Sequence, residues 1–352
     1  MDTLRQHSRR ASSVSTNAPT VDVIIPHFNG VEILDKCLAS LEKVTYPNLS
    51  VIIVDNGTVD ESLKLASEKY KRIKILSAGK NLGYAGGCNF GFRRTRGKYA
   101  VFLNNDTEQE PDWLERLVEV AEKDDRIAAV QPKLLSMQAR QRGEKVFDYA
   151  GAAGGMLDAL GYPYARGRVF NSVEDDRGQY DTVTEIFWAS GAAMMVRRSV
   201  VEELGAFDDD FFAHMEEIDL CWRMKLAGYR VVCVPDAVVY HYGGATLAAG
   251  NPRKIYLNHR NNLMMIVKNA SLGRLLWLLP VRIILELAAL LYYRFYAGDY
   301  VRYAWRALWW NVQNFTKTLA KRRNIQAMRR QADKDIFKNS GGCVVLKKVI
   351  FG

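Results

Sequence analysis

The chain has 352 residues, of which 48% are hydrophobic, so it can bury a large core, and these values exclude a largely disordered protein. Its formal net charge of +10 favours an anionic partner such as a nucleotide, a nucleic acid or acidic lipid, although a solvated basic face would give the same excess. The five cysteines are scattered and form no CxxC pair, which argues against a disulfide framework or a zinc site.

The first part of the chain predicts an α/β sheet. Residues 1–20 are rich in Ser, Thr, Asn and Arg without an apolar run, which predicts a flexible tail and not a secretory signal. Beyond them, short apolar runs alternate with helical patterns, and this alternation predicts a mostly parallel sheet. The predicted strands are 21–25, 51–55, 73–76, 99–103 and 127–131, and the predicted helices are 31–43, 60–70, 84–96 and one that begins at Pro111.

The middle of the chain is less regular. Residues 132–185 are Gly-rich and predict an irregular excursion beside a substrate cleft. Regular structure is expected again at 186–197, followed by helices at 199–204 and 216–227, two short strands at 231–234 and 237–241, and a helix at 253–268.

The last third is apolar, aromatic and basic. Residues 272–297 are strongly apolar but contain Pro280, Arg282 and Glu286, which makes them a poor membrane-spanning helix. Arg282 and Glu286 are four residues apart and can pair on one helix face. Residues 299–323 mix three tryptophans with Arg and Lys, a composition typical of a helix lying in the membrane interface. A buried helical hairpin or a dimer interface would have the same composition, so these alternatives stay open.

Polar residues follow the predicted strands, where ligands bind in such sheets. The two common nucleotide cradles, GxGxxG after the first strand and GxxxxGK[ST], are both absent, so a different nucleotide site is expected. Asp55 could accept the imide N–H of a uracil or thymine ring, or it could be a turn residue. Asp106 could bind Mg²⁺ or Mn²⁺ bridging a diphosphate, or it could cap a turn.

Two further acids and a histidine lie near the end of the predicted sheet. Glu216 and Glu217 open a predicted helix, where the helix dipole alone would favour negative charge. The functional interpretation makes Glu217 the general base for an acceptor hydroxyl. His241 ends a predicted strand and is either a structural residue or a ligand.

Seven segments, in this order, resemble a family 2 glycosyltransferase of the GT-A fold and, within it, the rhamnosyltransferase-like branch. They are VIIPHFNG, VIIVDNGTVDES, NLGYAGGCNFG, FLNNDTE, SGAAMMVRR, MEEIDLCWR and YHYGG, and the resemblance covers residues 21 to about 268. It implies a mostly parallel central sheet flanked by helices in a catalytic domain at 21–250, with a nucleotide half at 21–131 and an acceptor half at 132–250. The tail 1–20 precedes this domain, and a C-terminal helical, membrane-associating region at 251–352 follows it.

The resemblance also implies roles for matching residues. Glu217 stands where the family usually has an aspartate base, with Glu216 and Asp219 as neighbouring alternatives. Asp106 and His241 would bind the divalent cation, Mg²⁺ or Mn²⁺, and Asn104 replaces the first acid of the usual DxD pair. The residues implied in nucleotide-sugar binding are Pro26, Phe28, Asp55, Asn56, Asn81, Gly83, Asn89 and Asn105. Those implied in the acceptor and donor pocket are Trp188, Ser190, Gly191, Glu216, Asp219 and Arg260.

The implied reaction is an inverting, metal-dependent glycosyl transfer. The donor most typical of the branch is dTDP-L-rhamnose, and the acceptor would be a hydroxyl of a growing cell-surface glycan on a polyprenyl diphosphate, at the cytoplasmic face of the cell membrane. A UDP-sugar donor such as UDP-galactofuranose is one alternative, and a catalytically silent nucleotide-sugar or glycan-binding scaffold is another. Nucleic acid is not an expected partner, because no aromatic-basic RNA motif is present. A homo-oligomer formed through the C-terminal helices stays open.

Overall fold

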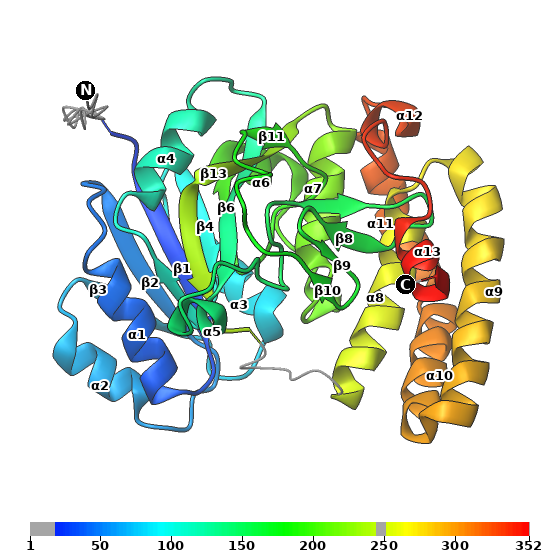
Figure 1. Ribbon diagram of the computed structural model, residues 1–352, viewed down its shortest axis with the longest axis horizontal. Coiled ribbons are helices and arrows are strands. Elements are labelled where there is room, and N and C mark those ends of the chain that lie inside the picture. The colour runs from blue at the N-terminus through cyan, green and yellow to red at the C-terminus, as the bar shows by residue number, and fades with distance from the viewer. Residues whose placement is uncertain (1–17, 244–250, 352) are drawn as a thin grey trace, which may run out of the picture.

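The computed structural model describes residues 18–243 and 251–351, so the predicted tail at 1–20 lies almost wholly outside the described residues. A twisted sheet occupies one end of the molecule and a group of long C-terminal helices occupies the other (Figure 1). A second, smaller sheet lies between them.

The main sheet has nine strands in the order β11-β13-β6-β12-β4-β1-β2-β3, with β5 also paired to β13. Its strands are β1 (Val21–His27), β2 (Leu49–Asp55), β3 (Ile73–Ser77), β4 (Tyr99–Leu103), β5 (Thr107–Gln109), β6 (Ile127–Ser136), β11 (Thr184–Glu185), β12 (Ala193–Arg197) and β13 (Arg230–His241). The β4-β1-β2-β3 half is parallel, β6 pairs in parallel with β13, and β12 runs antiparallel between β4 and β6. The predicted mostly parallel α/β sheet is confirmed.

Helices cover both faces of this sheet. They are α1 (Val31–Leu41), α2 (Ser62–Lys69), α3 (Gly83–Phe92), α4 (Trp113–Ala121), α5 (Met137–Gln141), α6 (Arg198–Leu204) and α7 (Glu216–Leu226), with a short 3₁₀ turn, η1 (Asp209–Phe211). The glycines of α3 let it approach the sheet closely. A Cβ atom on Gly91 would lie 2.5 Å from Cγ2 of Ile24 in β1, which is too close for any side chain.

The structure corrects two sequence-based expectations about strands. The predicted strands at 231–234 and 237–241 are one strand, β13, whose pairing with β6 shifts register between Val234 and Val238. Pro235 in this interval has no N–H to donate to the ladder, so the sequence resembles a break where the structure has a bulge.

The excursion at 132–185 is more regular than expected. Its first residues extend β6 to Ser136, and its later residues form a four-stranded antiparallel sheet. The strands are β7 (Gly155–Leu157), β8 (Pro163–Ala165), β9 (Arg168–Val169) and β10 (Ser172–Val173). Strands of two or three residues are too short to show an alternating pattern, so no periodic signal marks them in the sequence.

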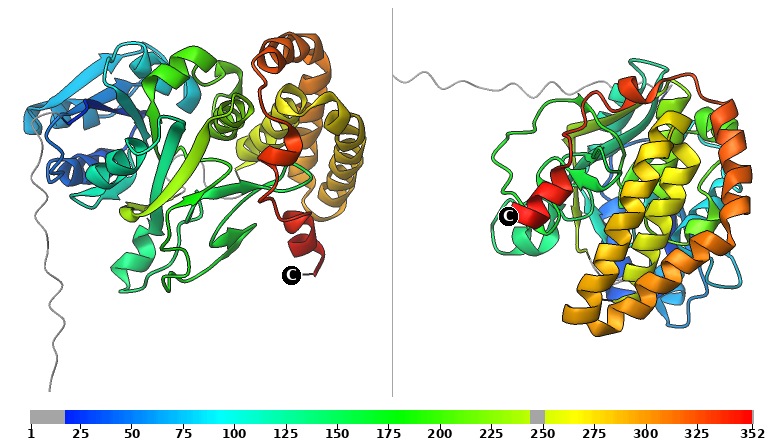
Figure 2. Two further views of the ribbon diagram at one scale, coloured as in Figure 1. Left: turned by 90° about the horizontal axis from the view of Figure 1, so that it is seen from above. Right: turned by 90° about the vertical axis from the view of Figure 1, so that its right-hand side faces the viewer.

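The C-terminal part is helical, and its three longest helices, α8, α9 and α10, lie side by side (Figure 2). The helices are α8 (Pro252–Asn269), α9 (Leu272–Tyr296), α10 (Gly298–Gln313), α11 (Phe315–Ala327), α12 (Asp333–Ile336) and α13 (Val344–Phe351). The aromatic and basic stretch at 299–323 thus contains two helices that meet at Asn314.

Buried charges join these helices to the sheet. Asp219 in α7 accepts a hydrogen bond from Arg223 at 2.9 Å and lies 2.9 Å from the ammonium of Lys268 in α8. Lys268 also lies 2.7 Å from Asp208, which in turn lies 2.5 Å from Lys321 in α11. Breaking such a buried pair leaves an uncompensated charge and typically costs about 3–5 kcal/mol. The helices are therefore an integral part of the fold.

Helix α9 turns charged side chains toward the protein and apolar side chains outward. In the part of the chain that the structure describes, it is the one helix long and apolar enough by composition to cross a membrane, with a mean hydropathy of 2.0. Yet Arg282 and Glu286 point inward, pair at 2.9 Å as predicted and are buried, and Arg282 donates to the carbonyl of Leu160. The outward face carries apolar side chains such as Leu276 and Ile284, which are 70% and 65% exposed. Charge faces the protein and hydrocarbon faces outward.

Candidate active site

The ends of β4 and β13 bring Asp106 and His241 together. Strand β5 follows Asp106 directly and pairs with β13, so that Thr107 lies opposite His241. As a result, Nε2 of His241 lies 3.1 Å from Oδ1 of Asp106, and both side chains are buried. The amide nitrogen of Asn104 is 3.3 Å from the same Nε2 atom.

A third residue, Asp148, holds the other side of the imidazole. Its Oδ1 atom lies 2.9 Å from Nδ1 of His241. Burial opposes charge on His241, but the carboxylates of Asp148 and Asp106 outweigh it and raise the pKa of the imidazole well above its ordinary value. Burial likewise opposes charge on Asp106, and the His241 charge nevertheless keeps the pKa of that carboxyl lowered. Sequence reasoning missed Asp148, because it lies in the excursion and belongs to no motif.

A strained turn precedes the second group of acids. Phe212, His214 and Met215 have φ angles of 64°, 69° and 74°, in the left-handed region that non-glycine residues rarely adopt. Helix α7 begins immediately afterwards with Glu216. Strain of this kind persists only where the surrounding structure enforces it, and it is concentrated at functional sites.

Helix α8 enforces this turn. The side-chain amide of Asn261, which is fully buried, contacts the carbonyl oxygens of Phe211, Ala213 and His214 at 3.0, 2.9 and 2.7 Å. Its neighbour Arg260 donates to the carbonyls of Asp210 and Phe211 at 2.7 and 2.8 Å. Sequence reasoning singled out Arg260 but missed Asn261.

The three acids of α7 have different ionisation. Burial raises the pKa of Glu217 to about 7. Burial, together with the charge of Glu217, raises the pKa of Glu216 well above its usual value. Burial opposes charge on Asp219 too, but Lys268 and Arg223 keep its pKa lowered. The Oε2 atoms of Glu216 and Glu217 have no hydrogen-bond partner among the described residues.

A segment before β12 connects the two groups of acids. The carbonyl of Ala192 accepts a hydrogen bond from the N–H of Asn104 at 3.0 Å, next to Asp106. The carbonyl of Gly191 accepts from the phenol of Tyr84 in α3. Burial raises the pKa of this phenol, and Cys88, Glu216 and Glu217 add to the rise. The N–H of the next residue, Ala85, donates to the carbonyl of Phe212, in the turn before α7, at 3.1 Å. Two consecutive residues, Gly191 and Ala192, thus contact Tyr84 of α3 and the loop that carries Asp106.

Two neighbours of Gly191 are held by the excursion. The hydroxyl of Ser190 donates to the carbonyl of Ala150 at 2.8 Å, two residues after Asp148. The indole of Trp188 donates to the carbonyl of Met156 at 2.8 Å and packs on Gly155. The small sheet therefore supports this segment from behind.

The predicted nucleoside residues form a turn system at the ends of β1 and β2. Asp55 accepts from the N–H groups of Gly57 and Thr58, and these bonds contribute to the lowering of its pKa although burial is the largest influence and opposes it. The side chain of Asn56 donates to the carbonyl of Gly83 and accepts from Leu82.

Gly83 itself adopts a φ of 72°. A Cβ atom there would lie 2.3 Å from the carbonyl oxygen of Phe212, so the turn before α3 touches the strained turn before α7. Asn81 accepts the N–H of Gly83 at 2.9 Å. Phe28 is 41% exposed, whereas Pro26 packs on Gly87 of α3.

An unpredicted histidine, His27, positions Asn105. The amide nitrogen of Asn105 donates to Nδ1 of His27 at 2.8 Å, and burial lowers the pKa of His27 to about 4. The neutral ring must therefore carry its hydrogen on Nε2, which lies 2.7 Å from the hydroxyl of Ser62. The signal in the sequence was a polar residue ending an otherwise apolar strand.

Asn89 lies apart from this cluster. It is buried, and its amide binds the carbonyl of Phe207 at 2.8 Å and the carboxylate of Asp209 at 2.7 Å. These contacts tie α3 to the loop before η1. Asp219 and Arg260 likewise make the structural contacts described above.

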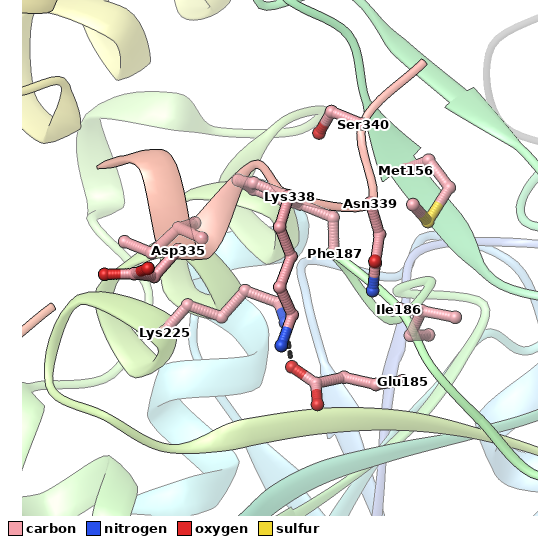
Figure 3. A pocket seen from close by; sticks show the side chains of 10 residues that line it. Met156, Glu185, Ile186, Phe187, Lys225, Asp335, Lys338, Asn339 and Ser340 are labelled. Atoms are coloured by element: carbon pink, nitrogen blue, oxygen red, sulfur yellow. Dashed lines mark hydrogen bonds and ion pairs between the residues drawn. The ribbon is translucent and has the colours of Figure 1, made fainter. Parts of the chain in front are cut away.

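One crevice can be set aside as a substrate site. It lies under the C-terminal segment at 335–340, beside Phe187 and the Lys225–Glu185 ion pair at 2.9 Å (Figure 3). Its cavity volume of about 10 Å³ has room for one water molecule.

Comparison with known sequences decides the family. A sequence model described as Glycosyl transferase family 2 matches residues 22–205, which is more than half of the chain. The chain belongs to glycosyl transferase family 2. The matched segment of this family 2 enzyme contains Asp55, Asp106 and Ser190, and it ends before α7, so Glu217 lies beyond it.

Relatives of this family 2 glycosyltransferase agree with the assignment. It is 26% identical over 259 residues to the N-acetylglucosaminyl-diphospho-decaprenol L-rhamnosyltransferase of Mycobacterium tuberculosis (strain CDC 1551 / Oshkosh), covering 68% of this chain and 81% of the relative. Its structure resembles the mannosyltransferase PcManGT from Pyrobaculum calidifontis in complex with GDP-Man and Mn²⁺, with a TM-score of 0.51, 16% identity, and coverage of 92% and 89%. It also resembles GalNAc-T7 with UDP, GalNAc and Mn²⁺, with a TM-score of 0.55, 16% identity, and coverage of 72% and 48%.

These findings confirm the predicted family, its rhamnosyltransferase-like character and the GT-A fold. The protein is a glycosyltransferase. The roles of individual site residues remain predictions.

Proposed function

We propose that this glycosyltransferase moves L-rhamnose from dTDP-L-rhamnose to a hydroxyl of a glycan carried on a polyprenyl diphosphate, with inversion at the anomeric carbon. The observation that carries the proposal is the buried Asp106–His241 pair, together with a strained turn that touches the start of α3 and leads into Glu217, whose pKa burial raises to about 7. The printed name of the mycobacterial relative, which includes both rhamnose and a diphospho-decaprenol, supports the choice of donor and acceptor class.

Glu217 is the proposed base because its neighbours are unsuited. A base must be deprotonated near neutral pH and still hold a proton well, so a pKa close to 7 is favourable. Burial and the charge of Glu217 raise the pKa of Glu216 well above its usual value, and the Asp219 carboxylate is paired with Lys268 and Arg223. The Glu217 carboxylate takes the proton of the acceptor hydroxyl. The hydroxyl oxygen then bonds to the anomeric carbon, and the bond from that carbon to the diphosphate oxygen breaks.

The pair Asp106 and His241 would hold a divalent cation, which would take the place of the proton that Nε2 shares with Asp106 when no ion is bound. The carboxylate oxygen of Asp106 and Nε2 of His241 are 3.1 Å apart, so both would be available to one bound ion. Asp148 on Nδ1 supplies the carboxylate–histidine contact that orients a metal-binding imidazole. Among residues 18–243 and 251–351 no third His, Cys, Asp or Glu joins them as a ligand, so water and phosphate oxygens would complete the shell. A bound cation would neutralise charge on the departing diphosphate.

The loops after β1, β2 and β4 are proposed to hold the nucleoside. Asp55 would accept the imide N–H of thymine, and the exposed ring of Phe28 would lie against the base. Asn105, oriented by His27, would contact the sugar or phosphate. The closed turn made by Asn56, Asn81 and Gly83 would fix the shape of this pocket.

The outward faces of α9 and α10 are proposed to rest on the cytoplasmic membrane surface. Exposed aromatic side chains, including Tyr292, Phe295 and Trp305, are of the kind that lies at the membrane–water interface. The buried Arg282–Glu286 pair keeps α9 attached to the protein, which favours a helix lying along the surface over one that spans it.

The deciding experiment is product analysis by mass spectrometry. Purified protein with Mn²⁺ is offered dTDP-L-rhamnose, UDP-galactofuranose or UDP-N-acetylglucosamine, each with a synthetic polyprenyl-diphosphate glycan. A deoxyhexose added only from dTDP-L-rhamnose supports the proposal. Transfer from another donor contradicts the sugar assignment, and nucleotide-sugar binding without any transfer contradicts the catalytic one.

A further inference from the structure

A group of basic side chains lies beside the proposed metal residues. The guanidinium of Arg168 in β9 is 4.6 Å from the centre of the Tyr149 ring, and the ammonium of Lys254 in the first turn of α8 is 5.5 Å from the same centre. Tyr149 is 46% exposed, so the ring forms part of a surface. The two cations come from segments 86 residues apart in the chain and converge next to Asp148.

These cations have little to neutralise them. Within the described residues neither forms an ion pair, and Arg168, which is only 7% exposed, makes one long hydrogen bond of 3.3 Å to the carbonyl of Phe170. Its Nε atom is buried without a partner. By contrast, the buried Arg223 lies 2.9 Å from the carboxylate of Asp219. An unpaired buried charge is costly, and a bound anion would offset that cost.

The pKa shifts of the two cations also favour a bound anion. Burial lowers the pKa of Arg168, and burial followed by repulsion from Arg168 lowers the pKa of Lys254. Asp148 is close enough to act on Arg168, but its Oδ1 atom already contacts His241 and the N–H of Ala150. The charge of Asp148 therefore also acts on His241 and is not available to Arg168 alone.

A buried histidine borders the group on the side of the base. Nε2 of His214 is buried without a partner, and burial together with the charge of Lys254 lowers its pKa to about 4. His214 belongs to the strained turn before Glu217. Arg253, next to Lys254, lies 4.4 Å from the centre of the Phe212 ring in that turn, and Tyr149 directly follows Asp148. The two cations are therefore close both to the Asp148–His241 pair and to the turn that carries the proposed base.

We propose that Arg168 and Lys254 bind an organic diphosphate at this edge of the active site. The inference rests on the proposed function, which supplies two sources of that group: the nucleoside diphosphate of the donor and the lipid diphosphate of the acceptor. Two cations, one carrying a planar fork of N–H donors, suit a diphosphate with its several charged oxygens. The Tyr149 ring lies against both cations and fixes their positions.

The first test measures binding of inorganic pyrophosphate by calorimetry, without metal. The Arg168→Gln/Lys254→Gln double variant should bind pyrophosphate at least about tenfold more weakly than the natural protein, since it loses two charge-assisted contacts. The single variant Arg168→Lys keeps the charge and should bind pyrophosphate more tightly than the double variant does. It also tests whether a loss of binding comes from misfolding. Arg140→Gln is the control, because Arg140 also stacks on a tyrosine, at 3.8 Å, but has Glu110 as a partner. Unchanged pyrophosphate affinity in a folded double variant overturns the site.

The second test identifies the source. If the acceptor diphosphate binds here, the double variant raises KM about tenfold or more for a polyprenyl-diphosphate acceptor and leaves KM for a neutral alkyl glycoside acceptor and the Kd of dTDP unchanged. If the donor diphosphate binds here, the Kd of dTDP rises instead. Natural protein that binds pyrophosphate but transfers no sugar contradicts the proposed function alone. Transfer by a protein whose double variant still binds pyrophosphate contradicts this site alone.

Discussion

The side-chain amide nitrogen of Asn261 lies 2.7 Å from the carbonyl oxygen of His214. Through this contact and those to Phe211 and Ala213, helix α8 holds a turn with three left-handed residues immediately before Glu216 and Glu217. The position of the proposed base thus depends on a residue 44 positions later in the chain. The amide nitrogen of Asn261 contacts backbone carbonyls and its oxygen accepts from Nε of Arg260 at 2.8 Å, so its role is to position the base.

Replacing Asn261 with Asp should therefore impair turnover more than binding. The substitution keeps the shape but replaces the donor by a carboxylate that faces three carbonyl oxygens. We expect kcat to fall by about tenfold to a hundredfold, because small displacements of a catalytic group are costly, while the Kd of dTDP stays within about twofold. Steady-state kinetics and nucleotide titration provide the two numbers.

The neighbouring Asn262 supplies the control for that experiment. Its amide donates to the carbonyl of Gly161 at 2.8 Å, away from the turn, and it is equally buried. Asn262→Asp should lower the melting temperature but retain kcat. Equal losses of kcat in both variants would mean that Asn261 acts only through general stability.

Glu217→Gln should reduce the transfer rate by about two to four orders of magnitude, the usual contribution of a general base. Donor binding should change little, since the base acts on the acceptor. Glu216→Gln is the matched comparison and should retain much more activity. Near-normal turnover in Glu217→Gln would place the base elsewhere.

The pH profile should follow the same carboxyl. Because the base is active only when deprotonated and its pKa is about 7, kcat/KM should fall about tenfold per pH unit below 7 and level off above it. This fall below pH 7 should be absent from the residual rate of Glu217→Gln. A profile that stays flat from pH 5.5 to 8 contradicts the assignment.

The contribution of Glu217 to folding stability should fall as pH rises, whereas its contribution to turnover should increase. The pKa of Glu217 is raised in the folded state above its usual value, so the folded protein binds the proton more tightly than the unfolded chain does. Stability from this group is therefore present at pH 4.5 and is lost as pH rises through about 7. Glu217→Gln should melt at a higher temperature than the natural protein at pH 8, and the difference should shrink toward pH 5 in calorimetric scans.

Asp148→Asn should weaken metal binding. Loss of the carboxylate at Nδ1 of His241 typically lowers metal affinity about tenfold to a hundredfold. The Mn²⁺ titration followed by electron paramagnetic resonance measures this without turnover. Asp175→Asn, at an exposed acid paired with Arg177, is the control and should bind Mn²⁺ normally.

The outward face of α9 can be tested with vesicles. Leu276→Glu and Ile284→Glu together should reduce cosedimentation with vesicles of phosphatidylglycerol and phosphatidylcholine by about tenfold or more, since each loses the burial of an apolar side chain. Val59, which is 82% exposed in the loop before α2, gives the control Val59→Glu. Natural protein that forms a dimer through this face and ignores vesicles would contradict the membrane proposal.

Much of the fold was accessible from the sequence, because the alternation of strands and helices from residue 21 to 131 is local information. The short strands of the small sheet and the bulge in β13 were not, since two-residue strands have no period and Pro235 resembles a break. The orientation of α9 could be predicted only in part from the sequence. Spacing predicted the Arg282–Glu286 pair, whereas the direction in which it points depends on the Leu160 carbonyl, far away in the chain.

The candidate site was accessible where a motif marks it. Asp106 and His241 were singled out separately, and their contact arises from the pairing of β5 with β13, which no local pattern encodes. Asp148, His27 and Asn261 act on other side chains or on backbone and belong to no motif. A residue that acts through tertiary contacts is visible only once the fold is known.

The buried pairs of Lys268 and Lys321 with Asp208 also limit how such enzymes can be re-engineered. Arg322 and Gln326 of α11 additionally donate to the last carbonyls of α8. A truncation after residue 269 would therefore remove Lys321 from Asp208 and leave these carbonyls without their donors. Swapping the last eighty residues between homologues as a modular cassette should therefore give insoluble chimeras, unless the matching acids are transplanted with them.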